Sequence, residues 1–242
     1  MYDFLSRTSN LIGEEALEKL SKSKIIIFGV GGVGSYVTEA LARAGVGNLV
    51  LFDGDTVNVS NINRQLVATH KTIGEYKVDV MKRRILDINP EANVIANRCY
   101  FNETNSSDWD FSEYDYIVDA IDSVSCKVHI AVKANNENAR IISSMGTGNK
   151  LNPMNFKVCD IYKTQVCPLA RVMRRELKKS GIKKLKVVYS DEKPVVSGTE
   201  DENVTKKIVP TSISFVPSVA GLILAGEVVK DLTINQYGRG DE

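Results

Sequence analysis

The chain has 242 residues, of which 31 are Lys or Arg and 30 are Asp or Glu, and 43% are hydrophobic. A chain of this length can bury a substantial core, and a charged fraction of 25% without any low-complexity run excludes disorder as the main state. No apolar stretch reaches the ~18 residues of a membrane span, and residues 1–21 hold no apolar signal segment, so we expect a cytoplasmic protein with no membrane partner.

The first half of the chain alternates between strand and helix patterns. Short apolar runs, typical of strands buried on both faces, occur at 24–28, 49–52, 93–96, 116–118 and 141–142. Apolar residues at helical spacing occur at 33–44, 75–88 and 124–136. This order predicts an α/β fold, a Rossmann-like doubly wound and mostly parallel sheet with helices on both faces.

The last hundred residues depart from this alternation. We expect strands at 156–159 and 185–190, separated by a basic helix over 168–179. The polar stretch 193–210 predicts a long loop. Residues 214–232 have an apolar helical pattern on more than one face, which favours deep burial or a subunit interface.

The organisation that these patterns predict is one domain over 1–242. Its nucleotide-binding half is 1–150, and 151–242 is a C-terminal strand and helix elaboration for substrate and dimer contacts. The cysteines are scattered at 99, 126, 159 and 167 without a Cys-x-x-Cys pair, which favours reduced thiols over a zinc site or a disulfide framework.

A glycine-rich turn follows the first strand directly. Its glycines are Gly29, Gly31, Gly32 and Gly34. Such a turn lets the backbone approach a phosphate closely, while the N–H groups that begin the next helix point at it. Asp53 comes at the end of the second strand, where a carboxylate accepts hydrogen bonds from a ribose. These features indicate a nucleotide and are shared with nicotinamide and flavin enzymes.

The polar residues after Asp53 favour a triphosphate over a dinucleotide. They are Asp55, Asn61, Arg64, Gln65 and Lys77. Amide, guanidinium and ammonium groups suit the β- and γ-phosphates of ATP. Asp122, which is predicted to end a later strand at the same sheet edge, is suited to Mg²⁺ that bridges phosphates.

The motifs at 29–34, 44–49, 53–55, 60–65 and 119–122 resemble the ubiquitin-activating-enzyme superfamily of ATP-dependent carboxylate adenylators (ThiF/MoeB-type). The resemblance implies that Asp53 binds the ribose and that Asn61, Arg64 and Lys77 bind the triphosphate. It also implies that Asp122 holds the metal. Arg7 matches an arginine that these enzymes insert into the partner subunit's ATP site, which implies a homodimer.

The second half of the chain distinguishes branches of this superfamily. The two Cys-x-x-Cys pairs of sulfur-carrier activators are missing, whereas 163–177, 186–190 and 214–222 resemble the tRNA threonylcarbamoyladenosine dehydratase family. This resemblance implies ATP-dependent cyclisation of N6-threonylcarbamoyladenosine in tRNA through a carboxyl-adenylate. Activation of the C-terminus of a ubiquitin-like sulfur carrier is the alternative, and a dinucleotide oxidoreductase or a noncatalytic scaffold also stays open. A thioester role for Cys167 is disfavoured because Pro168 follows it and no base is near.

A tRNA substrate gives a function to the basic segment. Between positions 171 and 186 there are eight basic residues and one acid, Glu176. We expect phosphate contacts, with salt-sensitive affinity, from Arg171, Arg174, Arg175, Lys178 and Lys179. Charge alone is equally typical of a solvated helix face.

Overall fold

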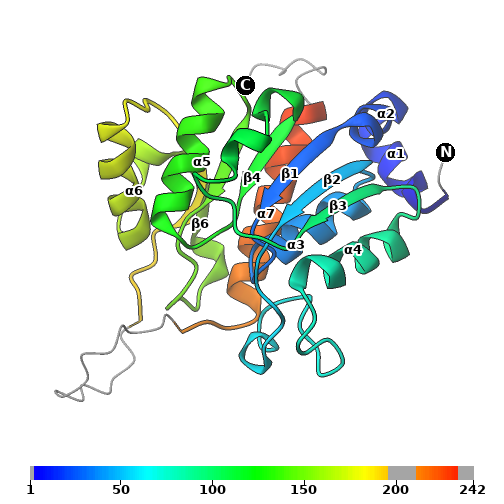
Figure 1. The fold of residues 1–242 in the computed structure, drawn as a ribbon, viewed down its shortest axis with the longest axis horizontal. Coiled ribbons are helices and arrows are strands. Elements are labelled where there is room, and N and C mark those ends of the chain that lie inside the picture. The colour runs from blue at the N-terminus through cyan, green and yellow to red at the C-terminus, as the bar shows by residue number, and fades with distance from the viewer. Residues whose placement is uncertain (1–2, 196–210, 234–242) are drawn as a thin grey trace.

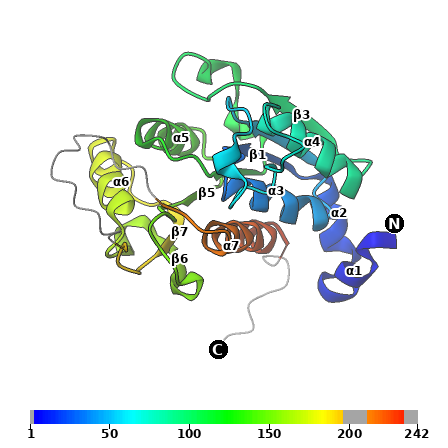
Figure 2. The same ribbon diagram turned by 90° about the horizontal axis from the view of Figure 1, so that it is seen from below.

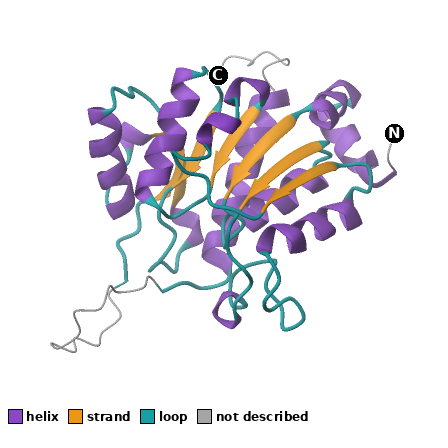
Figure 3. Ribbon diagram, viewed as in Figure 1, coloured by secondary structure: helices purple, strands orange, loops and turns teal. Residues whose placement is uncertain are grey.

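A seven-stranded sheet lies at the centre of the computed structural model, which describes residues 3–195 and 211–233 (Figures 1 and 3). The strands are β1 (Lys24–Phe28), β2 (Asn48–Phe52), β3 (Asn93–Asn97), β4 (Tyr116–Asp119), β5 (Ile141–Ser144), β6 (Phe156–Asp160) and β7 (Lys186–Ser190). Their order is β3-β2-β1-β4-β5-β7-β6, and all neighbours are parallel except β6, which is antiparallel to β7. The order of the first five strands is that of doubly wound nucleotide-binding sheets, which confirms the predicted fold class.

Helices cover both faces of the sheet. The seven α-helices of the described chain are α1 (Ser6–Ile12), α2 (Glu14–Lys22), α3 (Gly34–Arg43), α4 (Lys77–Ile88), α5 (Val124–Asn136), α6 (Pro168–Lys179) and α7 (Phe215–Thr233). Buried side chains of α2, α3, α4 and α7 share one core with the sheet, while α5 and α6 pack on the other face. Figure 2 shows α5 and α7 on opposite sides of the strands.

The central strands are buried on both faces, as their unbroken apolar runs predict. In β1, Ile25 and Ile27 face the core under α3 and α7. Ile26 and Phe28 point the other way, where Phe28 lies against Phe52 with the two ring centroids 5.2 Å apart. Side-chain alternation along a strand therefore supplies both layers of the core from one short segment.

Helix α7 lies unusually close to α3. A Cβ atom on Gly221 would come within 2.5 Å of the carbonyl oxygen of Val33, at the N-terminal end of α3. The predicted deep burial of this helix is confirmed on that side, where Val216, Ala220 and Leu224 are buried. Leu222 remains half exposed on the outer side.

Local differences from the sequence predictions have clear causes. Helix α4 begins at Lys77 instead of residue 75, because Tyr76 is extended and forms a β-bridge with Thr56. Strand β4 ends at Asp119, so Asp122 lies three residues beyond the strand rather than at its end. The sequence prediction contained no α2, and the predicted loop at 193–210 lies mostly outside the described residues. None of the described helices is long and apolar enough to cross a membrane.

Candidate nucleotide site

A cleft of about 860 Å³ opens at the carboxyl edge of the sheet, between the loops that follow β1 and β4. The connections from these neighbouring strands leave toward opposite faces of the sheet, and doubly wound folds bind ligands at such a position. The cleft is lined by the glycine-rich turn, by the loops that follow β2 and β5, and by the residues that begin α6 and α7. It therefore brings the two halves of the chain together.

The four glycines of the turn serve two purposes. Gly29 has a φ of +88°, and a Cβ on Gly34 would lie 1.8 Å from the carbonyl oxygen of Gly29, so the turn itself requires both. Around Gly31, by contrast, the nearest heavy atom to a Cβ would be 3.8 Å away, whereas a Cβ on Gly32 would lie 3.3 Å from Pro217 and 3.5 Å from Cγ of Arg64. Gly31 therefore keeps the backbone open toward the cleft, which Gly32 also lines.

Asp53 fixes the turn to the end of β2. One of its carboxylate oxygens accepts a hydrogen bond from the backbone N–H of Val30 at 2.8 Å, and the other accepts one from the N–H of Asp55 at 2.9 Å. Burial raises the pKa of Asp53, and this outweighs the charge of Lys77 and the two backbone hydrogen bonds, which lower it.

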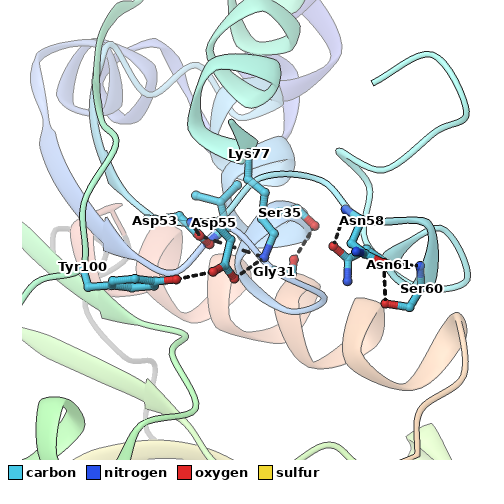
Figure 4. Close-up of polar contacts among 10 residues, drawn as sticks. Gly31, Ser35, Asp53, Asp55, Asn58, Ser60, Asn61, Lys77 and Tyr100 are labelled. Atoms are coloured by element: carbon cyan, nitrogen blue, oxygen red, sulfur yellow. Dashed lines mark hydrogen bonds and ion pairs between the residues drawn. The ribbon is translucent and has the colours of Figure 1, made fainter. Parts of the chain in front are cut away.

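Lys77, Asp55 and Tyr100 form a connected polar group beside Asp53. The ammonium of Lys77, which is 5% exposed, lies 2.6 Å from one oxygen of Asp55 and 4.0 Å from Asp53. The Tyr100 hydroxyl donates to the other oxygen of Asp55. Figure 4 shows Lys77 pointing toward both carboxylates, with Tyr100 beyond Asp55. Lys77 is thus already paired with an anion inside the cleft.

The pKa values of this group follow from these contacts. Burial raises the pKa of Asp55, but hydrogen bonds from Lys77 and Tyr100 outweigh that effect and hold it below its ordinary value. The hydrogen bond to Asp55, with some burial, raises the pKa of Tyr100 to about 12. Asp55 is therefore an anion and Tyr100 a neutral donor at neutral pH.

The loop after β2 carries the predicted Asn61, Arg64 and Gln65. It begins with a capping box. The side-chain oxygen of Asn61 accepts a hydrogen bond from the backbone N–H of Asn58, and the side chain of Asn58 accepts one from the backbone at the other end of the turn. Nη1 of Arg64 donates to the carbonyl oxygen of Ser60 at 2.9 Å. Gln65 is buried, and its Oε1 has no hydrogen-bond partner in the described chain.

Ser35 connects this loop to the glycine-rich turn. Its hydroxyl donates to the carbonyl oxygen of Gly31 at 2.6 Å and accepts from the N–H of Leu66 at 3.2 Å (Figure 4 shows the first of these bonds). The two loops that carry the predicted phosphate-binding groups are therefore held in one frame, and all of these groups except Gly34 line the cleft.

Asp122 reaches the cleft from the loop after β4, which a buried ion pair supports. Lys127 of α5 is fully buried and lies 2.9 Å from the equally buried Asp119, and it also donates to the carbonyl oxygen of Ile121. Asp122 itself is exposed, and it has no hydrogen bond or ion pair within the described chain. No group of three or more His, Cys, Asp or Glu side chains among the described residues could hold a metal unaided.

The remaining predicted residues lie outside the cleft. Arg7 is exposed on α1, at the opposite end of the sheet from the loops that line the cleft (Figure 1). On α6, Arg174 is half-buried and donates to Thr164, while Arg175 and Lys179 pair with Glu176. Arg171 and Lys178 are exposed, and neither has a hydrogen bond or ion pair in the described chain.

Two residues that the sequence prediction did not name contribute to the site: Tyr100 lines the cleft, and Lys127 lies buried beneath the loop after β4. Tyr100 follows β3 across a short loop, and no motif marks it. Lys127 carried a usable signal, because it occupies an inward position on α5 in register with Ile130, Ala131 and Ala134, where an apolar residue is expected. A lysine at such a position indicates a buried partner of opposite charge.

Comparison with known proteins agrees with this geometry. The ThiF family model matches residues 5–239. A Bacillus subtilis protein named tRNA threonylcarbamoyladenosine dehydratase is 45% identical over 94% of this chain and 93% of its own length. The structure of Escherichia coli tRNA N6-threonylcarbamoyladenosine dehydratase, TcdA, in complex with ATP is 30% identical, with a TM-score of 0.87 over 98% of this chain and 96% of that one.

The same Escherichia coli enzyme in complex with AMP matches with a TM-score of 0.86 and 30% identity over 96% of this chain and 94% of that one. Matches of this extent leave no large part of the chain unaccounted for. The chain belongs to the ThiF family and, within it, to the family of the tRNA threonylcarbamoyladenosine dehydratases.

Proposed function

We propose that this protein uses ATP to dehydrate N6-threonylcarbamoyladenosine in tRNA to its cyclic form. The observation that carries the proposal is the cleft between the loops that follow β1 and β4, in a chain of this family. The glycine-rich turn, the buried Asp53 and two cations, Arg64 and Lys77, all line this cleft. The bound ATP and AMP of the Escherichia coli relative support an adenylate-forming reaction in this cleft.

The reaction proceeds in two steps. A carboxylate oxygen of the threonine moiety attacks the α-phosphorus of ATP, the bond to the bridging oxygen breaks, and pyrophosphate leaves. A nitrogen or oxygen of the carbamoyl group then attacks the activated carbonyl carbon and displaces AMP. The ring closes, a proton is released, and the oxygen lost from the carboxylate leaves on AMP. The second step is intramolecular, so the protein need mainly hold the reacting groups in position.

The residues of the cleft have separate roles in the first step. Asp53 accepts hydrogen bonds from the ribose, and the turn at Gly31 and Gly32 receives the phosphates on backbone N–H groups. Arg64 and Lys77 stabilise the negative charge that develops on the departing pyrophosphate. Because Asp55 already pairs with Lys77, the triphosphate replaces one anion by another around a cation that is already in place.

Mg²⁺ fits the donor set at Asp122, a free carboxylate at the rim that would hold the ion together with phosphate oxygens. Its contribution would be to neutralise phosphate charge. Gly29, Gly34, Asp55, Asn61 and Gln65 complete the proposed nucleotide contacts, either directly or by shaping the two loops.

The tRNA would reach the cleft across α6, whose first residues line it. Arg171 and Lys178 have no anionic partner in the described chain, so a polyanion would supply one. We retain Arg174, Arg175 and Lys179 in the proposed interface, with smaller contributions because each is already engaged. A tRNA substrate is in keeping with a cytoplasmic location.

The active unit in this proposal is a homodimer in which Arg7 enters the partner's cleft. Two observations support it. Arg7 lies far from its own cleft, and two apolar side chains, Met154 at 86% exposed and Leu222 at 50% exposed, lie on two segments that pack together. Apolar exposure of this kind is typical of subunit interfaces.

The test is AMP and pyrophosphate release by the purified protein. We expect release with tRNA that carries threonylcarbamoyladenosine, together with conversion of the nucleoside to a product lighter by one water in mass spectrometry. Lys77→Ala should abolish both. Release with a ubiquitin-like sulfur carrier, and none with the modified tRNA, would establish the alternative function.

A further inference from the structure

A path of hydrogen bonds, joined by the peptide link between Thr211 and Ser212, runs from Asn149, in the loop after β5, to Arg64, in the loop after β2. The two residues line the same cleft from loops that follow different strands. The path passes through Thr211, Ser212 and Asn63, and none of these three belongs to the nucleotide-binding set described above.

The path begins on a fixed base. Glu192, just after β7, accepts hydrogen bonds from the backbone N–H groups of Leu151 and Asn152 at 2.9 and 3.0 Å. Its own carbonyl oxygen accepts from the ammonium of Lys150, which is 4% exposed, at 2.6 Å. The residues that follow Asn149 are thus held against the sheet.

Asn149 clamps Thr211 through side chain and backbone together. Its Oδ1 accepts from the N–H of Thr211 at 2.7 Å and from the Thr211 hydroxyl at 2.9 Å, and its own N–H donates to the Thr211 carbonyl at 2.8 Å. Asn149 has a φ of +57°, a conformation that asparagine, aspartate and glycine adopt at least cost. Its side chain acts here only as an acceptor.

The clamp reaches Arg64 in two further bonds. The carbonyl oxygen of Ser212 accepts from Nδ2 of Asn63 at 3.0 Å, and Oδ1 of Asn63 accepts from Nη1 of Arg64 at 2.9 Å. Nη1 is therefore occupied, whereas Nε and Nη2 of Arg64 have no partner in the described chain. One edge of the guanidinium is anchored and the rest is free for a ligand.

We propose that Asn149 is a positioning residue for Arg64, so that the segment beginning at Thr211 sets the angle at which the guanidinium meets the triphosphate. The inference rests on the proposed function, because it requires Arg64 to contact phosphate. Asn149 touches no reacting atom in this scheme. Its effect reaches the chemistry only through Asn63.

The test measures single-turnover AMP formation with modified tRNA, together with KM for ATP. Asn149→Gly keeps the φ and the backbone hydrogen bonds but removes Oδ1, and we expect a loss in rate of about tenfold, since misplacement of a catalytic group by an ångström costs up to about a hundredfold. Asn149→Asp restores the acceptor and should restore the rate to within about threefold, while its added charge raises KM for ATP.

Three comparisons separate the outcomes. Asn63→Ala should lose as much as Asn149→Gly, and the double variant should lose no more than either, because both break one path. Asn138→Gly is the matched control, since Asn138 also has a positive φ, of 53°, but lies at the end of α5; it should leave the rate unchanged. Additive losses at Asn149 and Asn63, or no rescue by aspartate, would overturn the proposal.

Arg64→Ala distinguishes failure of the path from failure of the function. If Arg64→Ala is inactive but Asn149→Gly is fully active, the path is wrong and the role of Arg64 stands. If Arg64→Ala is fully active, Arg64 has no role in adenylation and the positioning proposal fails, while the ATP-dependent dehydration stands. If the unsubstituted protein itself forms no AMP with modified tRNA, the proposed function fails.

Discussion

At the residue scale, the glycines of the turn are needed for two different reasons, ligand binding and the folding of the turn itself. We expect Gly31→Ala to weaken ATP binding by at least about tenfold, roughly 1.4 kcal/mol, while the melting temperature stays within about 2 °C. The reason is that the added methyl meets no protein atom closer than 3.8 Å but occupies the space in which we propose that a phosphate meets the backbone. Calorimetric titration with ATP and a thermal melt measure the two effects.

Gly34→Ala is the matched control for that variant. Its methyl would lie 1.8 Å from the carbonyl oxygen of Gly29, so the turn must distort and the melting temperature should fall by several degrees. If Gly31→Ala lowered the melting temperature as much as Gly34→Ala does, the open space at Gly31 would not be a ligand site.

At the element scale, α6 carries two kinds of basic side chain: those without an anionic partner in the described chain and those already paired with Glu176. Replacing Arg171 and Lys178 by glutamine should weaken tRNA binding and reduce the slope of log K against log salt by roughly 1.5 to 2, because two phosphate contacts are lost. ATP affinity should not change. Binding of labelled tRNA measured across a range of salt concentrations gives the slope.

Replacing Arg175 and Lys179 by glutamine removes the same charge from the same helix. Both already pair with Glu176, so the slope should fall by less than half as much. An equal fall in the two double variants would mean that overall charge, and not these particular side chains, governs binding.

The sequence predicted elements well where local pattern decides the structure. Strand β1 was found to the residue, since an apolar run of four after Lys24 is buried whatever surrounds it. The prediction from sequence failed where residues far apart in the chain determine the local structure. The start of α4 depends on a β-bridge between Tyr76 and Thr56. Arg174, predicted to be free for tRNA, instead donates a hydrogen bond to Thr164.

The candidate site was predictable to a similar degree. Conspicuous motifs supplied the glycine turn, Asp53, Arg64, Lys77 and Asp122, and the structure gathers these residues around one cleft. Tyr100, Asn63 and Asn149 could not be found in this way. Their importance lies in hydrogen bonds to residues far away in the chain, and an isolated asparagine or tyrosine carries no local signal of such a bond.

At the scale of the whole molecule, the proposed homodimer predicts complementation between inactive variants. We expect Arg7→Ala and Lys77→Ala each to be inactive alone, and a mixture refolded or co-expressed together to recover roughly a quarter of the sites, because half the dimers are mixed and each has one intact cleft. AMP formation per mole of chain measures the recovery.

A mixture of Arg64→Ala with Lys77→Ala is the control for that experiment. Both residues lie in one cleft of one chain, so every site in every dimer of this mixture has a defect and no activity should return. Recovery in the control, or none with Arg7→Ala, would place Arg7 outside the partner's site.

The contact between α7 and α3 has a consequence beyond packing. Because Gly221 rests on the carbonyl of Val33, a side chain at position 221 would push on the N-terminal end of the helix into which the glycine-rich turn leads. A genetic screen for lost activity should therefore recover substitutions at Gly221 with normal protein levels and poor nucleotide affinity. Such alleles would mimic damage to the active centre from a residue that no substrate ever touches.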